Sequence, residues 1–296
     1  MMGAVYALTA ALSWAGSSAI LKSLTTRIDA LSLNTLRLCA ASLLVLPLIL
    51  LSGRGTELIN TPLMPLVYLV VSGVISLAIG DTIFIKSLSY LNVSHAFPIA
   101  QCSNPVFTML LAVLLLGESF TWVTGLGTFF VLLGIYLITS TQMAPSIHST
   151  PGRIRGKGII LALIAGAVWA IAAVTLKLGA LDTDPLVAAA IWMSSATIVF
   201  LPFALSQRKQ GALQLKKYGS RSLALALTSG VVDLDVGVVL FIIAIQLIGA
   251  GKAVVLSSTS PLFLLPFSVF ILRERLTRFT LIGIFTGIAG ICLVAI

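Results

Sequence analysis

Residues 92–118 read NVSHAFPIAQCSNPVFTMLLAVLLLGE, an apolar stretch with a polar middle that ends at a proline. The stretch is long enough to cross a bilayer, since about 20 apolar residues at about 1.5 Å per residue span the hydrocarbon core. Residues 101–104 (QCSN) stand directly before Pro105. A proline removes one backbone donor and clashes with the preceding turn. We therefore expect this helix to kink or restart near its centre.

A second copy of this pattern occupies residues 249–274, GAGKAVVLSSTSPLFLLPFSVFILRE. Here residues 257–260 (SSTS) precede Pro261. In lipid, backbone groups freed at such a break must find partners inside the protein or in a water-lined cavity. Matched interrupted segments in the two halves of a chain indicate the binding site of a transporter.

The composition is that of a membrane protein. Of 296 residues, 58% are hydrophobic and 9% are charged, whereas a soluble domain carries about 25% charged residues. The net charge of +9 lies in short gaps between apolar runs. This distribution is typical of membrane orientation and not of nucleic-acid binding. We expect a multi-pass protein of the plasma membrane whose partners are the lipid bilayer and a small molecule, with no nucleic acid.

Ten apolar segments follow one another, at about residues 3–24, 31–52, 63–86, 93–116, 120–140, 157–179, 185–206, 222–246, 250–272 and 277–296. The longest polar gaps, 141–156 and 207–221, are too short for a soluble domain. The first gap contains prolines and a glycine, which are typical of a linker. We expect a first five-helix repeat at 1–142, a linker at 143–156 and a second five-helix repeat at 157–296.

Matched residues at nearly constant spacing support the repeat. The pairs are Trp14 and Trp169, Lys22 and Lys177, Asp29 and Asp184, Pro47 and Pro202, Pro105 and Pro261, and Glu118 and Glu274. Because five is an odd number, the second half must enter the membrane from the opposite side. The predicted fold is an all-α membrane protein with ten transmembrane helices, arranged as two inverted five-helix repeats.

The segments SNPVFTMLLAVLLLGE and TSPLFLLPFSVFILRE, with GLGTFFVLLGIYLI and GIFTGIAGICLVAI behind them, resemble EamA-type transporters of the drug/metabolite transporter superfamily. The resemblance covers the whole chain. It implies ten helices, alternating access and movement of small metabolites, often export, and it leaves the substrate open. The first half departs slightly, because Asn104 stands between Ser103 and Pro105, whereas Ser260 and Pro261 are adjacent.

Lys and Arg are distributed unevenly between the two sets of gaps. One set contains most of them, in residues 153–157, 208–221 and 273–278, and the other holds Arg54, Lys177 and Lys252. The positive-inside rule then places the first set in the cytoplasm and both termini outside. The family resemblance implies cytoplasmic termini instead, and we give the charge distribution of this chain the greater weight.

Polar and aromatic residues inside the apolar segments are the candidates for substrate binding: Trp14, Asn34, Arg37, Asp81, Gln101, Asn104, Trp169, Asp233, Ser257 and Ser258. A charge at a helix centre costs about 2.5–3.5 kcal/mol, so each one needs a partner or a wet cavity. Asp233 and Asp235 lie about 200° apart on a helix and cannot face the same cavity. We expect one to line the pathway and the other to pair elsewhere.

Each candidate also has a structural alternative. Both aspartates of the eighth segment could be salt-bridge partners, for example of Lys252. Asp81 could pair with Lys86 or Arg37, and Arg37 could snorkel from a helix end. The two matched tryptophans could pack or anchor at the interface, or form an aromatic wall of the cavity.

Two further features are interpreted structurally. We expect Glu118 and Glu274 to be capping or hinge residues. The GxxxG pattern of Gly283 and Gly287 predicts close helix packing within the chain, with a dimer seam as the alternative. We therefore expect a monomer or a weak dimer.

Motifs of soluble enzymes are absent from the sequence. It contains no GxxxxGK[ST] and no HExxH, has only two histidines, and its three cysteines show no CxxC spacing. We expect no enzyme activity, no cofactor and no metal site.

The predicted function is secondary transport of a small polar metabolite, best an amino acid or related zwitterion, outward by alternating access. A channel-like pore is the alternative. Helix N-termini after Pro105 or Pro261 would face an anionic group. Asp81 or Asp233 would face an amine or carry a proton, so proton coupling is left open.

Overall fold

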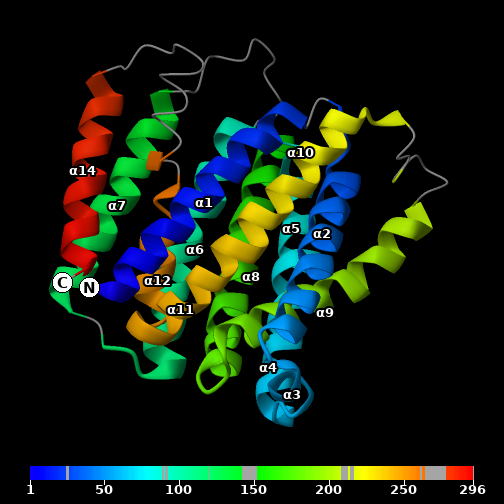
Figure 1. Cartoon of the computed structure of the whole chain (residues 1–296). Helices are drawn as coiled ribbons and strands as arrows, with labels where there is room; N and C mark the ends of the chain where they lie inside the picture. The colour runs from blue at the N-terminus through cyan, green and yellow to red at the C-terminus, as the bar shows by residue number, and fades with distance from the viewer. Residues whose placement is uncertain are drawn as a thin grey trace.

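The computed structural model describes residues 1–24, 27–88, 90, 93–119, 121–141, 152–207, 213, 217–260, 262–263 and 278–295. These residues form helices joined by short connections, and no strand occurs among them. Figure 1 shows the helices packed side by side, with the two ends of the chain close together at one edge. The all-α prediction is confirmed.

The first half contains α1 (Met2–Leu24), α2 (Ala30–Leu51), α3 (Gly55–Ile59), α4 (Leu63–Gly73), η1 (Val74–Gly80), α5 (Asp81–Leu88), α6 (Val93–Leu116) and α7 (Trp122–Thr141). The second half contains α8 (Gly152–Ala180), α9 (Pro185–Ser206), α10 (Ser220–Gly230), η4 (Val231–Val238), α11 (Val239–Ile248), α12 (Ala250–Ser257) and α14 (Arg278–Ala295). The short helix α3 lies in a gap for which no element is predicted from sequence.

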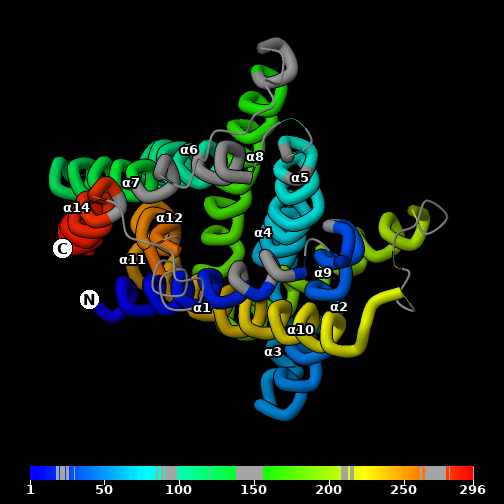
Figure 2. The backbone as a smooth tube through the Cα atoms, turned by 90° about the horizontal axis from the view of Figure 1, so that it is seen from above, coloured from blue at the N-terminus to red at the C-terminus, as the bar shows by residue number. Residues whose placement is uncertain are grey.

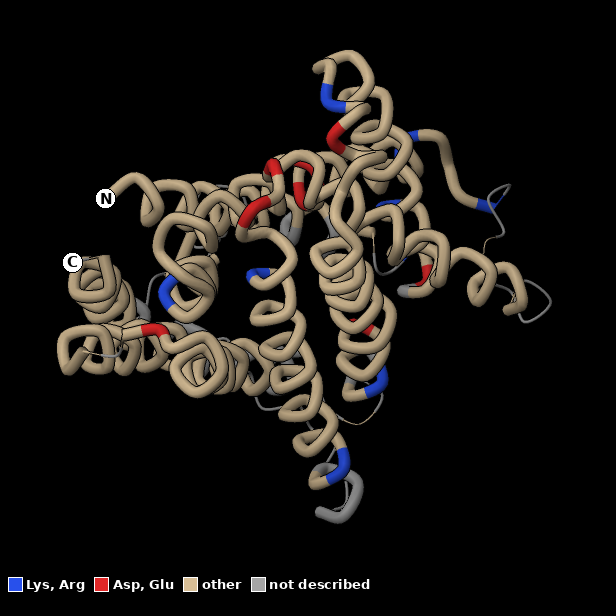
Figure 3. The backbone as a smooth tube through the Cα atoms, turned by 90° about the horizontal axis from the view of Figure 1, so that it is seen from below, with Lys and Arg blue, Asp and Glu red and all other residues tan. Residues whose placement is uncertain are grey.

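Six helical stretches within the described residues are long and apolar enough to cross a membrane: Leu31–Leu51, Leu63–Phe84, Ile99–Leu116, Gly156–Ala180, Pro185–Ser206 and Ser220–Ile248. Two of them are composite, because α4, η1 and α5 follow one another without interruption, as do α10, η4 and α11. Charged residues are sparse along the helices (Figure 3).

Matched aspartates begin two matched helices. Asp29 accepts hydrogen bonds from the backbone N–H of Ser32 at 2.9 Å and from its hydroxyl at 2.5 Å, at the start of α2. Asp184 accepts from the N–H of Leu186 at 2.9 Å at the start of α9. Such N-caps satisfy donors that have no partner within the helix. Burial acts to raise the pKa of Asp29, but hydrogen bonds from Ser32 and Tyr218 hold it below its usual value.

The predicted restart of the helix at Pro105 is wrong, because α6 continues past this residue to Leu116. Pro47 and Pro202 likewise lie inside α2 and α9. Prolines are tolerated in transmembrane helices where side chains and neighbouring helices satisfy the freed backbone groups. In the second copy α12 does end, at Ser257, and a turn follows; Pro261 lies outside the described residues.

The irregular backbone occurs instead in η1 and η4, two π-helical segments for which the sequence gives no prediction. Each ends near a glycine against which a tryptophan of the other half packs. A Cβ on Gly80 would collide with the indole of Trp169, and a Cβ on Gly237 would collide with that of Trp14. π-helical turns inside α-helices frequently mark functional sites.

The two halves interlock. Helix α1 packs along η4 and α11, and α8 packs along α4, η1 and α5; Figure 2 shows α1 running beside α10 and α11. At the contact between α2 and α9, the hydroxyls of Ser42 and Thr197 lie 2.8 Å apart. Helices α7 and α14 approach closely where Gly134 meets the backbone of Gly287. Packing of the α14 glycines within the chain is therefore confirmed.

Candidate functional site

A cavity of about 240 Å³ lies between the halves of the bundle. Nine of the ten residues proposed from sequence line it: Trp14, Arg37, Asp81, Gln101, Asn104, Trp169, Asp233, Ser257 and Ser258. A larger surface hollow of about 420 Å³ lies between α3 and the start of α9. We place the candidate site in the cavity between the halves, because it contains charged groups from both halves and lies among the long apolar helices.

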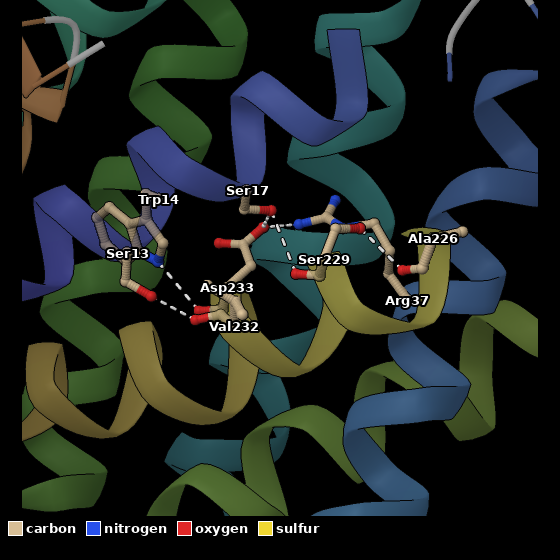
Figure 4. Close-up of polar contacts among 8 residues, drawn as sticks. All are labelled: Ser13, Trp14, Ser17, Arg37, Ala226, Ser229, Val232 and Asp233. Atoms are coloured by element: carbon tan, nitrogen blue, oxygen red, sulfur yellow. Dashed lines mark hydrogen bonds and ion pairs between the residues drawn. The ribbon is translucent and has the colours of Figure 1, made fainter. Parts of the chain in front are cut away.

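An ion pair joins the halves across this cavity. Arg37 of α2 reaches Asp233 of η4, and the two side chains are only 13% and 16% exposed (Figure 4). The hydroxyl of Ser17 lies 3.3 Å from the same carboxylate oxygen, Oδ2. Asp233 therefore pairs with Arg37, and the suggested pairing with Lys252 is wrong. The suggestion that Arg37 snorkels is also wrong, because its side chain is buried.

The pairing uses only part of the guanidinium. Asp233 contacts the Nη2 group of Arg37. The Nε atom of Arg37 is buried and has no hydrogen-bond partner among the residues that the structure describes. An arginine can present two parallel N–H groups to one carboxylate. Arg37 thus keeps one donor without a described partner, and this donor is enclosed beside the ion pair, where the open space of the cavity does not reach it.

Asp81 is the other acid of the cavity. The indole Nε1 of Trp169 donates a hydrogen bond of 3.0 Å to Oδ1 of Asp81. Within the described part of the chain this carboxylate forms no ion pair with either Lys86 or Arg37. Asp81 is therefore held by a neutral donor, and Arg37 lies near enough to interact with it electrostatically without forming an ion pair.

The two matched tryptophans both line the cavity and pack against the opposite half. The ring of Trp14 lies 5.2 Å from that of Phe241, and the ring of Trp169 lies 5.4 Å from that of Phe84. The Nε1 of Trp14 donates to the carbonyl of Asp233 at 3.2 Å. Each tryptophan thus both packs between helices and forms part of the cavity wall.

The remaining predicted lining residues lie on α6 and at the end of α12. The amide oxygen of Asn104 accepts from the Thr108 hydroxyl at 3.0 Å. The hydroxyls of Ser257 and Ser258 donate to the carbonyl of Val254 at 3.1 and 2.8 Å. Each serine hydroxyl still has lone pairs that can accept a hydrogen bond from a bound molecule.

Two polar residues lie away from the cavity lining. Asn34 is buried, and its Nδ2 has no partner among the described residues. Asp235 is 9% exposed, and neither carboxylate oxygen has a hydrogen-bond partner in the described part of the chain. Asp233 and Asp235 do face different surroundings, as predicted, but Asp235 does not pair elsewhere among those residues.

Sequence reasoning missed Trp192 and Ser72, which also line the cavity. The Nε1 of Trp192 donates to the Ser72 hydroxyl at 2.9 Å, which donates to the carbonyl of Ala172 at 2.7 Å. The repeat could have revealed Trp192, because it occupies the position in α9 that Arg37 occupies in α2.

Glu118 has a structural role at the end of the bundle. Its carboxylate accepts from Lys177 Nζ at 2.7 Å and from the backbone N–H groups of Ala250 and Gly251 at 2.7 and 3.1 Å. Glu118 therefore caps α12, a helix of the other half. The capping prediction is confirmed for Glu118, while Glu274 lies outside the described residues.

Comparisons with known proteins agree over the whole chain. The model of a family described as "EamA-like transporter family" matches residues 1–140 and again residues 156–296. An uncharacterized transporter of Archaeoglobus fulgidus is 27% identical over 294 residues, which are 99% of this chain and 98% of the relative. A solved crystal structure of a protein aligns with a TM-score of 0.82 at 17% identity, covering 98% of this chain and 95% of that chain, and shows the fold alone.

Proposed function

The chain belongs to the EamA-like transporter family and is a multi-pass membrane protein, and from this premise we propose that it exports a small zwitterion by alternating access. An amino acid or a related compound is the substrate class. The observation that carries the proposal is the cavity between the halves, where Asp81 has no ion-pair partner among the described residues and Arg37 contacts Asp233 through Nη2.

We propose that the membrane domain has ten spans in two inverted five-helix repeats, at 1–142 and 157–296, with a linker at 143–156. The double match of one family model supports two repeats. The first helix of each half, α1 or α8, packs against the composite helix of the other half, and this symmetric arrangement supports two equivalent repeats. Inverted repeats place the substrate at their interface near the midplane, which is where alternating access needs it.

The chemistry of the lining supports a zwitterion. Asp81 can receive an ammonium group, because its present partner is the neutral indole of Trp169. Arg37 can receive a carboxylate by turning Nη2 and the enclosed Nε–H, which has no partner among the described residues, toward the cavity. A cavity of about 240 Å³ is smaller than the roughly 300–1,000 Å³ of drug-sized sites. A metabolite with both charges and few other atoms fits this space, whereas a polyanion would meet only one base.

The route to alternating access involves the two π-helical segments. Each contacts the tryptophan of the other half at a glycine, which has no side chain of its own, so the indole lies directly against the backbone there. Rocking of one half against the other about such contacts would open the cavity to either side in turn. Since Asp233 pairs with Arg37 in the empty cavity, Asp81 is the lining acid that an amine or a coupled proton meets first.

Counterflow in liposomes tests this function. Purified protein in vesicles preloaded with an unlabelled compound should accumulate the labelled compound transiently and saturably, across a panel of amino acids, sugars and nucleobases. The same assay with an imposed pH gradient tests proton coupling. Flux that never saturates would favour the channel-like pore, and a monomer–dimer analysis in detergent would show whether the carrier works alone.

A further inference from the structure

We propose that Asp233 is an internal competitor for the carboxylate of the substrate: Arg37 binds Asp233 in the empty cavity and exchanges it for that carboxylate on binding. This inference rests on the proposed function, since it assigns the two poles of the zwitterion to named residues. The released Asp233, together with Asp81, then faces the ammonium group. Asp233 is thereby a specificity-determining residue and more than a structural salt-bridge partner.

The geometry of the pair permits exchange. Arg37 and Asp233 both line the cavity, so a bound molecule meets them directly. Asp233 occupies one end of the guanidinium, and the buried Nε–H beside it is unpartnered among the described residues. When the guanidinium turns toward the cavity, a carboxylate that displaces Asp233 from Nη2 can also accept from the Nε–H, which gives the two-pronged contact that arginine prefers.

The surroundings of Asp233 hold its backbone while leaving its side chain a second partner. Ser13 donates to the carbonyl of Val232, and Trp14 donates to the carbonyl of Asp233 at 3.2 Å (Figure 4). These bonds fasten η4 to α1. The Ser17 hydroxyl lies 3.3 Å from the carboxylate and 3.2 Å from the carbonyl of Ser229, so it can turn its one hydrogen to Asp233 when Arg37 turns away. Asp233 can therefore change partner by side-chain rotation alone.

An internal competitor keeps Arg37 paired when no substrate is bound. Leaving a buried charge without a partner is strongly unfavourable, yet the empty carrier must also change conformation. With Asp233 present, the empty cavity has no unpaired base. A zwitterion replaces one ion pair by at least two, because its ammonium compensates the released acid. A simple carboxylate brings no such compensation, and the site therefore discriminates against it.

The ion pair of Arg37 and Asp233 has no charged counterpart at the equivalent positions of the repeat. The positions equivalent to Arg37 and Asp233 in the repeat hold Trp192 and Ser76, which are uncharged and also line the cavity. The substrate's carboxylate is accordingly directed toward α2 and η4, with its ammonium between Asp233 and Asp81. An asymmetric pair of charges on a pseudo-symmetric frame gives the substrate one orientation.

The test uses acetate, a carboxylate without an ammonium group, and the purified full chain in detergent. Wild-type protein and Asp233→Asn are titrated with acetate by calorimetry and by thermal shift. Removing the competitor should lower the dissociation constant for acetate about tenfold or more, because closely paired charges are coupled by at least this factor. Asp184→Asn is the matched control, since Asp184 pairs with Arg54 at 3.2 Å away from the cavity.

The outcomes separate clearly. Tighter acetate binding by Asp233→Asn, but not by Asp184→Asn, supports the proposal. Equal acetate affinity in wild type and Asp233→Asn overturns it. If Asp233→Asn does not fold, it is replaced by Asp233→Ser, which copies Ser76 of the other half. If neither variant folds, the ion pair has a structural role and the proposal is overturned. Acetate binding requires no transport, so failed counterflow with a positive acetate result would reject the transport function alone.

Discussion

Replacing Glu118 by alanine should destabilise the fold by about 3–5 kcal/mol, the usual effect of removing one partner from a buried ion pair. The Glu118 and Lys177 side chains are 13% and 15% exposed and lie 2.7 Å apart. The same carboxylate also accepts from two N–H groups at the start of α12, at 2.7 and 3.1 Å. The substitution therefore leaves one cation and two backbone donors without their partner.

The reverse substitution should have a smaller effect. In Lys177→Met, Glu118 keeps both backbone donors of α12, so only one charged hydrogen bond is lost, which contributes about 1.5–3 kcal/mol. The loss of stability should be larger for Glu118→Ala than for Lys177→Met, because the carboxylate has three partners and the ammonium has one described partner. A simple ion pair would predict similar losses from either side.

The free energy of unfolding can be measured in mixed micelles by titration with a denaturing detergent, monitored by circular dichroism. Glu57→Ala is the control, because Glu57 lies exposed on α3. A loss below about 1 kcal/mol for Glu118→Ala, within the range of surface ion pairs, would refute the reasoning. So would a larger loss for Lys177→Met than for Glu118→Ala.

Three further predictions concern topology, the cavity and pH. A cysteine introduced as Ser149→Cys should resist an impermeant thiol reagent in intact cells, because positive charges after it place the linker in the cytoplasm; efficient labelling would invert the orientation. Gln101→Leu and Ser258→Leu should impair counterflow more than Leu115→Ile, since they put bulk and an apolar surface into the cavity lining, and normal transport by both would move the site elsewhere. The pKa of Asp29 is lowered in the folded protein, so its cap stabilises α2 fully above the usual pKa of aspartate and is lost as the pH falls through the pKa of the folded state. Asp29→Asn should abolish this acid-dependent loss of stability, and an unchanged dependence of stability on pH would contradict the prediction.

Much of the lining could be predicted from sequence because lipid penalises polar groups so strongly. Arg37, Asp81 and Asp233 interrupt apolar segments, and a charge there must face the interior of the bundle. That argument places a residue on the inner side without naming its neighbour. Asn34 shows the limit, since the same reasoning selects it although it lies buried outside the cavity lining.

Partners could not be predicted, because they depend on which helices cross and at what height. Arg37 and Asp233 belong to different halves, and their contact exists because α2 packs against both α10 and η4. By sequence alone, Lys252 is an equally suitable ion-pair partner for Asp233. In the structure Lys252 lies on α12, near the end that Glu118 caps, and Asp233 pairs with Arg37 instead. Nothing in hydropathy or spacing separates these two bases.

The backbone irregularities were predicted at the wrong residues for a related reason. A proline has an unmistakable local effect, yet α6 accommodates Pro105 without ending. A π-helical turn has no residue signature of its own, and η1 and η4 are distinguished only by the glycines to which tryptophans of the other half come close. Because Asp233 lies within η4 and Asp81 directly follows η1, the widened turns and the acids of the site coincide. The matched tryptophans, Trp14 and Trp169, therefore indicate better than the matched prolines where the halves meet around the cavity, because each packs on a glycine of the π-helical segment of the other half.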